Sequence, residues 1–120
     1  MKTIAMKEIK SDRYSVIYDG STQTVNFHGS FRRMGMAEYE PIEELLQDIA
    51  AQEPDLITWN MKDLQLLNSA GFRMLSKLLI SLRNNKKIQI KVQGCKEITW
   101  QDTSLKNFKR LMPNLILEWQ

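Results

Sequence analysis

The sequence predicts an α/β domain in which strands and helices follow one another in the order β-β-α-β-α-β-α-β. Two short β-rich runs open the chain on either side of the turn signal "DGST". Three segments then carry apolar residues at helical spacing. Each of them is followed by a short run that is apolar or that alternates apolar and polar residues. Three consecutive βα units imply right-handed crossovers and a sheet that is at least partly parallel.

The first half of the chain predicts a hairpin and a helix. "RYSVIYDG" (13–20) and "QTVNFHG" (23–29) form the two strands of the hairpin. "EYEPIEELLQDIAAQ" (38–52) predicts the first helix, because Pro41 suits a first turn and one face carries an apolar stripe of Ile42, Leu45, Leu46 and Ile49. The helix should end at Glu53, which precedes a proline.

The second half predicts two further helices between three strands. A second helix carries Phe72, Leu75, Leu78, Leu79 and Leu82 at helical spacing. The remaining predicted elements are the strand "DLITWNM" (55–61), the strand "KIQIKVQG" (87–94), the helix "TSLKNFKRLM" (103–112) and the strand "NLILEW" (114–119). A length of 120 residues suits one domain, 1–120, with residues 1–12 as a segment before the hairpin.

Composition excludes several functional classes. The net charge is +3, but Lys and Arg are spread along the chain, so we expect no nucleic-acid partner. One Cys and one His, Cys95 and His28, are too few for a conventional zinc site, and we expect no metal, no cofactor and no catalytic residue. The chain opens without a secretory signal and its longest apolar run, 78–82, is far below spanning length. We therefore expect a cytoplasmic protein that is not an enzyme and does not insert into a membrane.

The stretch "LLNSAGFRML" (66–75) is the candidate functional site. It lies where the second predicted helix begins, beyond the carboxyl end of a predicted strand, and ligands of open α/β sheets bind at such places. A helix N-terminus accepts phosphate readily, so Ser69 is a candidate phosphoacceptor. Ala70 and Gly71 would keep the approach to the hydroxyl clear, and Arg73 could reach back to the phosphate. A plain helix cap is the alternative interpretation.

"NMKDLQLLNSAG" resembles the signature of STAS domains, specifically of the anti-sigma factor antagonists. That pattern is an apolar strand, an acidic-leucine turn like Asp63-Leu64, and then Asp-Ser-Ser/Thr-Gly at a helix start. The predicted element order agrees over residues 13–119. In that family a dedicated serine kinase phosphorylates the residue that corresponds to Ser69. Phosphorylation releases the antagonist from its kinase/anti-sigma partner, and a PP2C-type phosphatase restores binding.

The sequence also resembles a second group of bacterial regulatory phosphoproteins, which act on a diguanylate cyclase. Their junction reads "LNTSS", and the stretch "FHGSFRRMGMAEYEPIEELL" (27–46) is similar to theirs. This chain departs from the antagonist pattern at three positions. Asn68 replaces the usual Asp, Ala70 replaces the second hydroxyl residue, and Arg73 stands where many antagonists have a small residue.

The resemblance implies a partner-binding surface around Ser69. We expect it to include the residues that flank Ser69 and a basic doublet in the loop 31–36, namely Asn68, Ala70, Gly71, Phe72, Arg73, Arg32 and Arg33. Two other functions remain open. The domain could serve as a constitutive scaffold or sensor-complex subunit that is never phosphorylated, or as a module that binds a small ligand in the same crevice.

Overall fold

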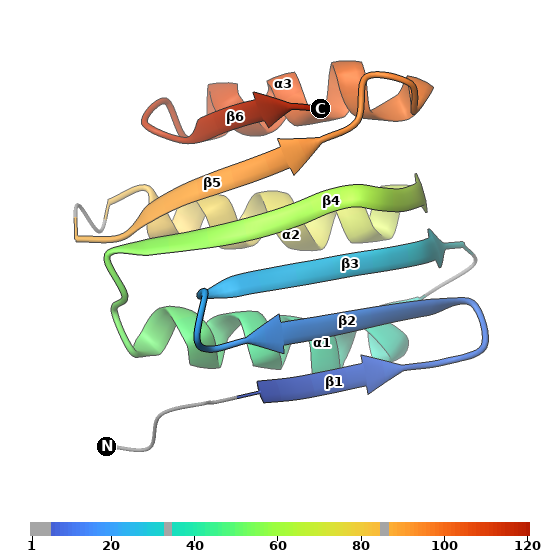
Figure 1. Ribbon diagram of the computed structural model, residues 1–120, viewed down its shortest axis with the longest axis horizontal. Coiled ribbons are helices and arrows are strands. Elements are labelled where there is room, and N and C mark those ends of the chain that lie inside the picture. The colour runs from blue at the N-terminus through green and yellow to red at the C-terminus, as the bar shows by residue number, and fades with distance from the viewer. Residues whose placement is uncertain (1–5, 33–34, 85–86) are drawn as a thin grey trace.

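A computed structural model describes residues 6–32, 35–84 and 87–120 of the chain. Within these residues, one six-stranded sheet and three helices form two layers, with all three helices on the same face of the sheet (Figure 1). In chain order the elements are β1 (Met6–Lys10), β2 (Tyr14–Asp19), β3 (Thr24–Phe31), α1 (Met36–Ala51), β4 (Leu56–Leu67), α2 (Ser69–Leu82), β5 (Gln89–Gly94), α3 (Thr99–Leu111) and β6 (Ile116–Trp119).

The strands lie in the sheet in the order in which they occur in the sequence. β1, β2 and β3 are antiparallel neighbours, whereas β3, β4, β5 and β6 are parallel to one another. Each parallel step is connected through a helix, as the predicted βα units require. The predicted α/β class and the element order from β2 onward are therefore confirmed.

The structure adds one strand that the sequence did not indicate. β1 has the sequence "MKEIK", and of its side chains only that of Ile9 is partly buried. β1 is held by backbone pairing with β2, from Met6 opposite Asp19 to Lys10 opposite Ser15. It forms one edge of the sheet, where lysines are common because they discourage further strand pairing. A strand without an apolar face carries no periodic signal. The sequence therefore predicted only a segment before the hairpin, 1–12, in the place where β1 lies.

The core lies between the sheet and the helices. Its largest side chains that are wholly buried include Phe27, Trp59, Leu75 and Phe108. The opposite face of the sheet carries polar side chains, as expected for a sheet face without a covering layer. On this face the Asn60 side-chain amide donates to Asn26 Oδ1 at 2.8 Å.

β4 runs to Leu67, six residues beyond its predicted end, so the expected turn at Asp63-Leu64 is wrong. β5 pairs with β4 only as far as Asn60, and the following part of β4 pairs with β3 alone. Beyond Asn60, the start of α3 instead of β5 provides hydrogen-bond partners for β4. Gln101 Nε2 donates to the carbonyls of Met61 (2.7 Å) and Leu64 (3.1 Å), and the Trp100 indole donates to the Gln65 carbonyl at 2.9 Å.

The contact between α3 and β4 explains both where α3 begins and where β4 ends. α3 begins at Thr99, four residues earlier than predicted, because its first turn must reach β4. β4 stays extended because side chains of α3 satisfy carbonyls that would otherwise be left without a strand partner. The extended strand delivers the chain directly to the start of α2. Among the described residues, no helix is both long and apolar enough to cross a membrane.

Candidate functional site

Ser69 is the first residue of α2 and is exposed to solvent. The cap of the helix is Asn68, whose side-chain oxygen accepts the Gly71 backbone N–H at 2.9 Å. Within the part of the chain that the structure describes, the Ser69 hydroxyl makes no hydrogen bond. The plain helix cap that was the alternative interpretation therefore exists, but Asn68 provides it. The Ser69 hydroxyl is exposed and takes no part in the cap.

We call the step from the end of β4 at Leu67 to the start of α2 at Ser69 the Ser69 junction. Asn68 connects three elements at this junction. The Tyr39 hydroxyl of α1 donates to Asn68 Oδ1 at 2.6 Å, and the Asn68 backbone N–H donates to the Phe31 carbonyl at the end of β3 at 3.0 Å. The Asn68 carbonyl accepts the Phe72 N–H at 3.0 Å, which begins the α2 hydrogen-bond series. The position of Ser69 at the start of α2 is thus set by contacts of Asn68 with α1 and β3.

Tyr39 is a neutral donor in this network. Its ring is buried, and burial, followed by the nearby negative charge of Glu38, raises the pKa of Tyr39 well above its ordinary value of 10.0. The ring also packs edge-on against Phe31, with centroids 5.5 Å apart. The hydroxyl therefore keeps its proton at neutral pH and holds α1 against the start of α2.

Gly71 has a packing role that the sequence did not indicate. It is buried in the first turn of α2. A Cβ atom there would lie 2.5 Å from the Tyr39 hydroxyl and 2.6 Å from Leu67 Cδ1, closer than real Cβ contacts. The absent side chain makes room for Tyr39, so Gly71 serves the packing of α1 on α2.

The other predicted surface residues differ in their exposure. Phe72 is partly buried and stacks on Phe108 of α3, with ring centroids 5.0 Å apart and an interplanar angle of 13°. Arg73 is exposed on the first turns of α2. Arg32 is exposed and directly follows Phe31, whose carbonyl accepts the Asn68 N–H, so its backbone lies beside the junction. Arg33 lies outside the described residues.

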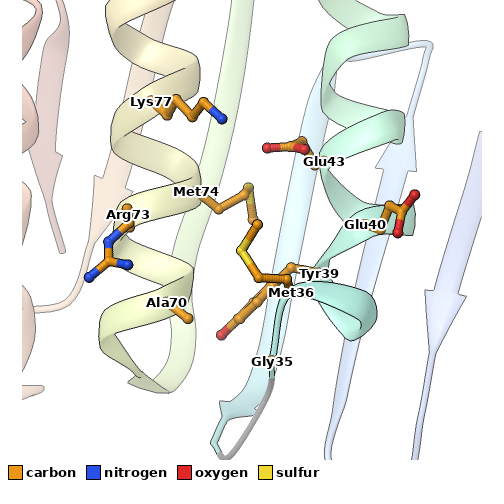
Figure 2. A pocket seen from close by; sticks show the side chains of 9 residues that line it. All are labelled: Gly35, Met36, Tyr39, Glu40, Glu43, Ala70, Arg73, Met74 and Lys77. Atoms are coloured by element: carbon orange, nitrogen blue, oxygen red, sulfur yellow. The ribbon is translucent and has the colours of Figure 1, made fainter.

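A groove between α1 and α2 lies next to the Ser69 junction (Figure 2). It has a volume of about 380 Å³. Its lining residues come from the first three turns of each helix and from the α1 cap, and they are Gly35, Met36, Tyr39, Glu40, Glu43, Ala70, Arg73, Met74 and Lys77. We call it the α1–α2 groove.

The sequence analysis placed Ala70 and Arg73 at the site but missed the α1 side of this groove. Met36 is 80% exposed at the first position of α1, an unusual place for a large apolar side chain. An apolar residue before the buried stripe of α1 was the available signal. It could not be paired with α2 without knowing that the two helices are neighbours.

Comparison with solved structures decides the fold. The chain matches SiaC of Pseudomonas aeruginosa with a TM-score of 0.69 at 10% identity, covering 98% of both chains. It also matches an anti-sigma factor antagonist from Mycobacterium paratuberculosis with a TM-score of 0.54 at 16% identity, covering 94% of this chain and 85% of that one. This chain has a STAS-like fold. No protein-family model and no curated protein matches the sequence.

His28 and Asp63 form a side-chain pair across two neighbouring strands. His28 on β3 and Asp63 on β4 are neighbours, with Nδ1 and Oδ2 3.5 Å apart, and both are well exposed. Among the described residues, no group of three or more His, Cys, Asp or Glu side chains is placed to hold a metal ion. The notable features of the domain are therefore an exposed serine at a helix start and the groove beside it.

Proposed function

We propose that this STAS-like domain is a regulatory protein-binding module of a bacterial partner-switching pathway, gated by phosphorylation of Ser69. It acts by binding and not by catalysis. The observation that carries the proposal is the exposure of Ser69 at the first position of α2, with the capping role taken by Asn68. A serine in this place has no evident structural task.

The local surroundings suit a phosphate. A phosphoserine at a helix start lies near free N–H groups and the positive end of the helix dipole. Arg73 is exposed one turn further along α2 and could pair with the added charge. The first turn of α2 contains no acidic residue that would repel the phosphate. The modification should therefore change the stability of the fold by no more than roughly 1–2 kcal/mol.

The effect of phosphorylation should fall on partner binding. A phosphoserine carries about −1.5 to −2 charges at neutral pH. A partner surface fitted to a neutral serine would have to remove water from that charge without offering a counter-charge, which costs several kcal/mol. A loss of about 4 kcal/mol weakens binding roughly a thousandfold.

The partners we propose are those implied by the resemblance: a serine kinase or anti-sigma-like protein, and a PP2C-type phosphatase. A diguanylate cyclase is a further proposed partner, in line with the second group of phosphoproteins that the sequence resembles. Structural similarity to SiaC and to an anti-sigma factor antagonist supports this choice. The exposed residues Arg73 and Arg32, with the partly buried residues Asn68, Ala70 and Phe72, would form the contact surface around Ser69; Gly71, also predicted there, is buried and would act through packing.

Phosphorylation can be tested in the native cell. We expect intact mass measurement and phosphopeptide mapping to find one phosphate on Ser69, and none in a Ser69→Ala variant. Ser11 and Ser21 are exposed serines outside helices and serve as internal controls. Phosphate mainly on these serines would contradict the proposal. A chain that is unmodified under every growth condition would favour the constitutive scaffold instead.

A further inference from the structure

We propose that the α1–α2 groove is the docking site for an amphipathic helix of a partner protein, with basic residues along one flank of that helix and acidic residues along the other. This inference rests on the proposed function, because it names the kind of partner segment that binds beside Ser69. It is carried by three features of the groove: its apolar base, the opposite charges of its two rims, and the helical nature of its walls.

The base of the groove is apolar and adaptable. The side chains of Met36 from α1 and Met74 from α2 meet between the two helices, above the ring of Tyr39 (Figure 2). Ala70 keeps the lower end open because its side chain is small. Methionine side chains are flexible and polarisable, so they fit apolar partners of different shape. Such a base favours a site that must accept more than one partner.

The two rims carry opposite charges. Glu40 and Glu43 line the groove from α1, and Arg73 and Lys77 line it from α2. The side chains of Glu43 and Lys77 point toward the groove from opposite walls (Figure 2), yet among the described residues no ion pair joins the two rims. These charges are therefore free to pair with a ligand whose flanks are basic toward α1 and acidic toward α2.

The walls determine the conformation of the ligand. Both walls are helices, whose backbone groups are hydrogen-bonded within each helix, so the groove presents no strand edge for an extended peptide to pair with. A helix needs no such edge, because it inserts side chains at positions i, i+3, i+4 and i+7. Met36 is 80% exposed at the start of α1, so its side chain is accessible to an arriving helix.

A designed peptide tests the site directly. The probe is a helical peptide of about 18 residues with Leu at i, i+3, i+4 and i+7, Lys on one flank and Glu on the other. Binding to the unphosphorylated full chain is followed by NMR of the methionine methyl groups. We expect the Met36 and Met74 signals to shift with the peptide. Met6 is 68% exposed on β1 and is the matched control that should not move.

Two results of this experiment would overturn the proposal. Unchanged Met36 and Met74 signals at millimolar peptide would overturn the proposal. Equal shifts at Met6 would overturn it too, because they would mean non-specific adhesion to exposed apolar side chains.

Charge reversal tests the two rims. Glu43→Lys should weaken binding of the probe about three- to tenfold, because one pairing is lost and a repulsion is added. Reversing the other three rim charges as well (Glu40→Lys, Arg73→Glu and Lys77→Glu) should restore the affinity, since a helix with mixed flanks can then bind in the reversed direction. Glu44→Lys alters the neighbouring exposed position outside the groove and should leave the affinity unchanged. Equal effects of Glu43→Lys and Glu44→Lys, or no recovery in the fully reversed variant, would refute the docking geometry.

The outcome is separable from that of the proposed function. The probe measurement uses no kinase and no native partner, so failure of Ser69 phosphorylation would leave it unchanged. If Ser69 is phosphorylated but the probe never reaches the groove, the gating proposal stands and the docking proposal fails.

Discussion

Replacing Gly71 by Ala tests the central packing contact of the Ser69 junction. In an open helix position, the change from Gly to Ala would stabilise the protein by up to about 1 kcal/mol. Here the new Cβ would lie 2.5 Å from the Tyr39 hydroxyl and 2.6 Å from Leu67 Cδ1. Both neighbours would have to move by about 1 Å to reach ordinary contact distance. The hydroxyl cannot move without disturbing its 2.6 Å hydrogen bond to Asn68.

The expected magnitude follows from these contacts. Overpacking of a buried site costs about 1–3 kcal/mol, and weakening the hydrogen bond of Tyr39 adds about 1 kcal/mol. After subtraction of the helix-propensity gain, Gly71→Ala should lower the free energy of unfolding by about 1–3 kcal/mol. Urea unfolding followed by circular dichroism measures this difference.

Two further variants isolate the cause. Gly35→Ala is the matched control, because a Cβ there meets no atom within 4 Å, and it should change the free energy of unfolding by about 0.5 kcal/mol or less. In a Tyr39→Phe background, which removes the hydroxyl, Gly71→Ala should cost less, with a coupling of about 0.5–2 kcal/mol. A Gly71→Ala protein as stable as the parent would refute the reasoning.

Three other predictions concern the same region. Gln101→Leu should lower the free energy of unfolding, measured in urea, by about 2–5 kcal/mol, because two β4 carbonyls and the Cys95 N–H lose their partner. Gln89→Leu, at an exposed position, is the control and should not lower it by that amount. Asn68→Asp keeps the oxygen that accepts both hydrogen bonds and should melt within a few degrees of the parent, whereas Asn68→Ala should lose about 2–4 kcal/mol. The raised pKa of Tyr39 means that the folded state holds this proton more tightly. Its contribution to stability is therefore present below pH 10 and lost above it, and alkaline titration should destabilise Tyr39→Phe less than the parent.

The sequence was informative wherever burial leaves a periodic pattern. α2 was predicted because its buried residues, Leu75, Leu78, Leu79 and Leu82 among them, recur on one face. β1 was missed because its side chains are largely exposed and only its backbone is paired. The extension of β4 was missed because Gln101, far along the chain, supplies the hydrogen bonds that keep it extended. Such long-range polar contacts carry no local signal.

The site could be predicted only in part, because some of its features are local in the sequence and others depend on contacts between elements. Ser69 at a helix start was visible from the sequence, because a helical pattern follows it directly. The task of Gly71 was not, since it depends on Tyr39, which lies on another helix. The groove beside Ser69 likewise depends on the neighbouring positions of Met36 and Met74, which only the fold brings together.

The most direct test of the account is the affinity of a native partner for three forms of the chain. A partner protein recovered with the unmodified chain as bait would be titrated, by calorimetry, with the unmodified, Ser69-phosphorylated and Ser69→Ala proteins. We predict that Ser69→Ala binds like the unmodified chain and that phosphorylation weakens binding about a thousandfold. Equal affinity of all three forms would contradict the account and leave Ser69 as an ordinary exposed residue at a helix start.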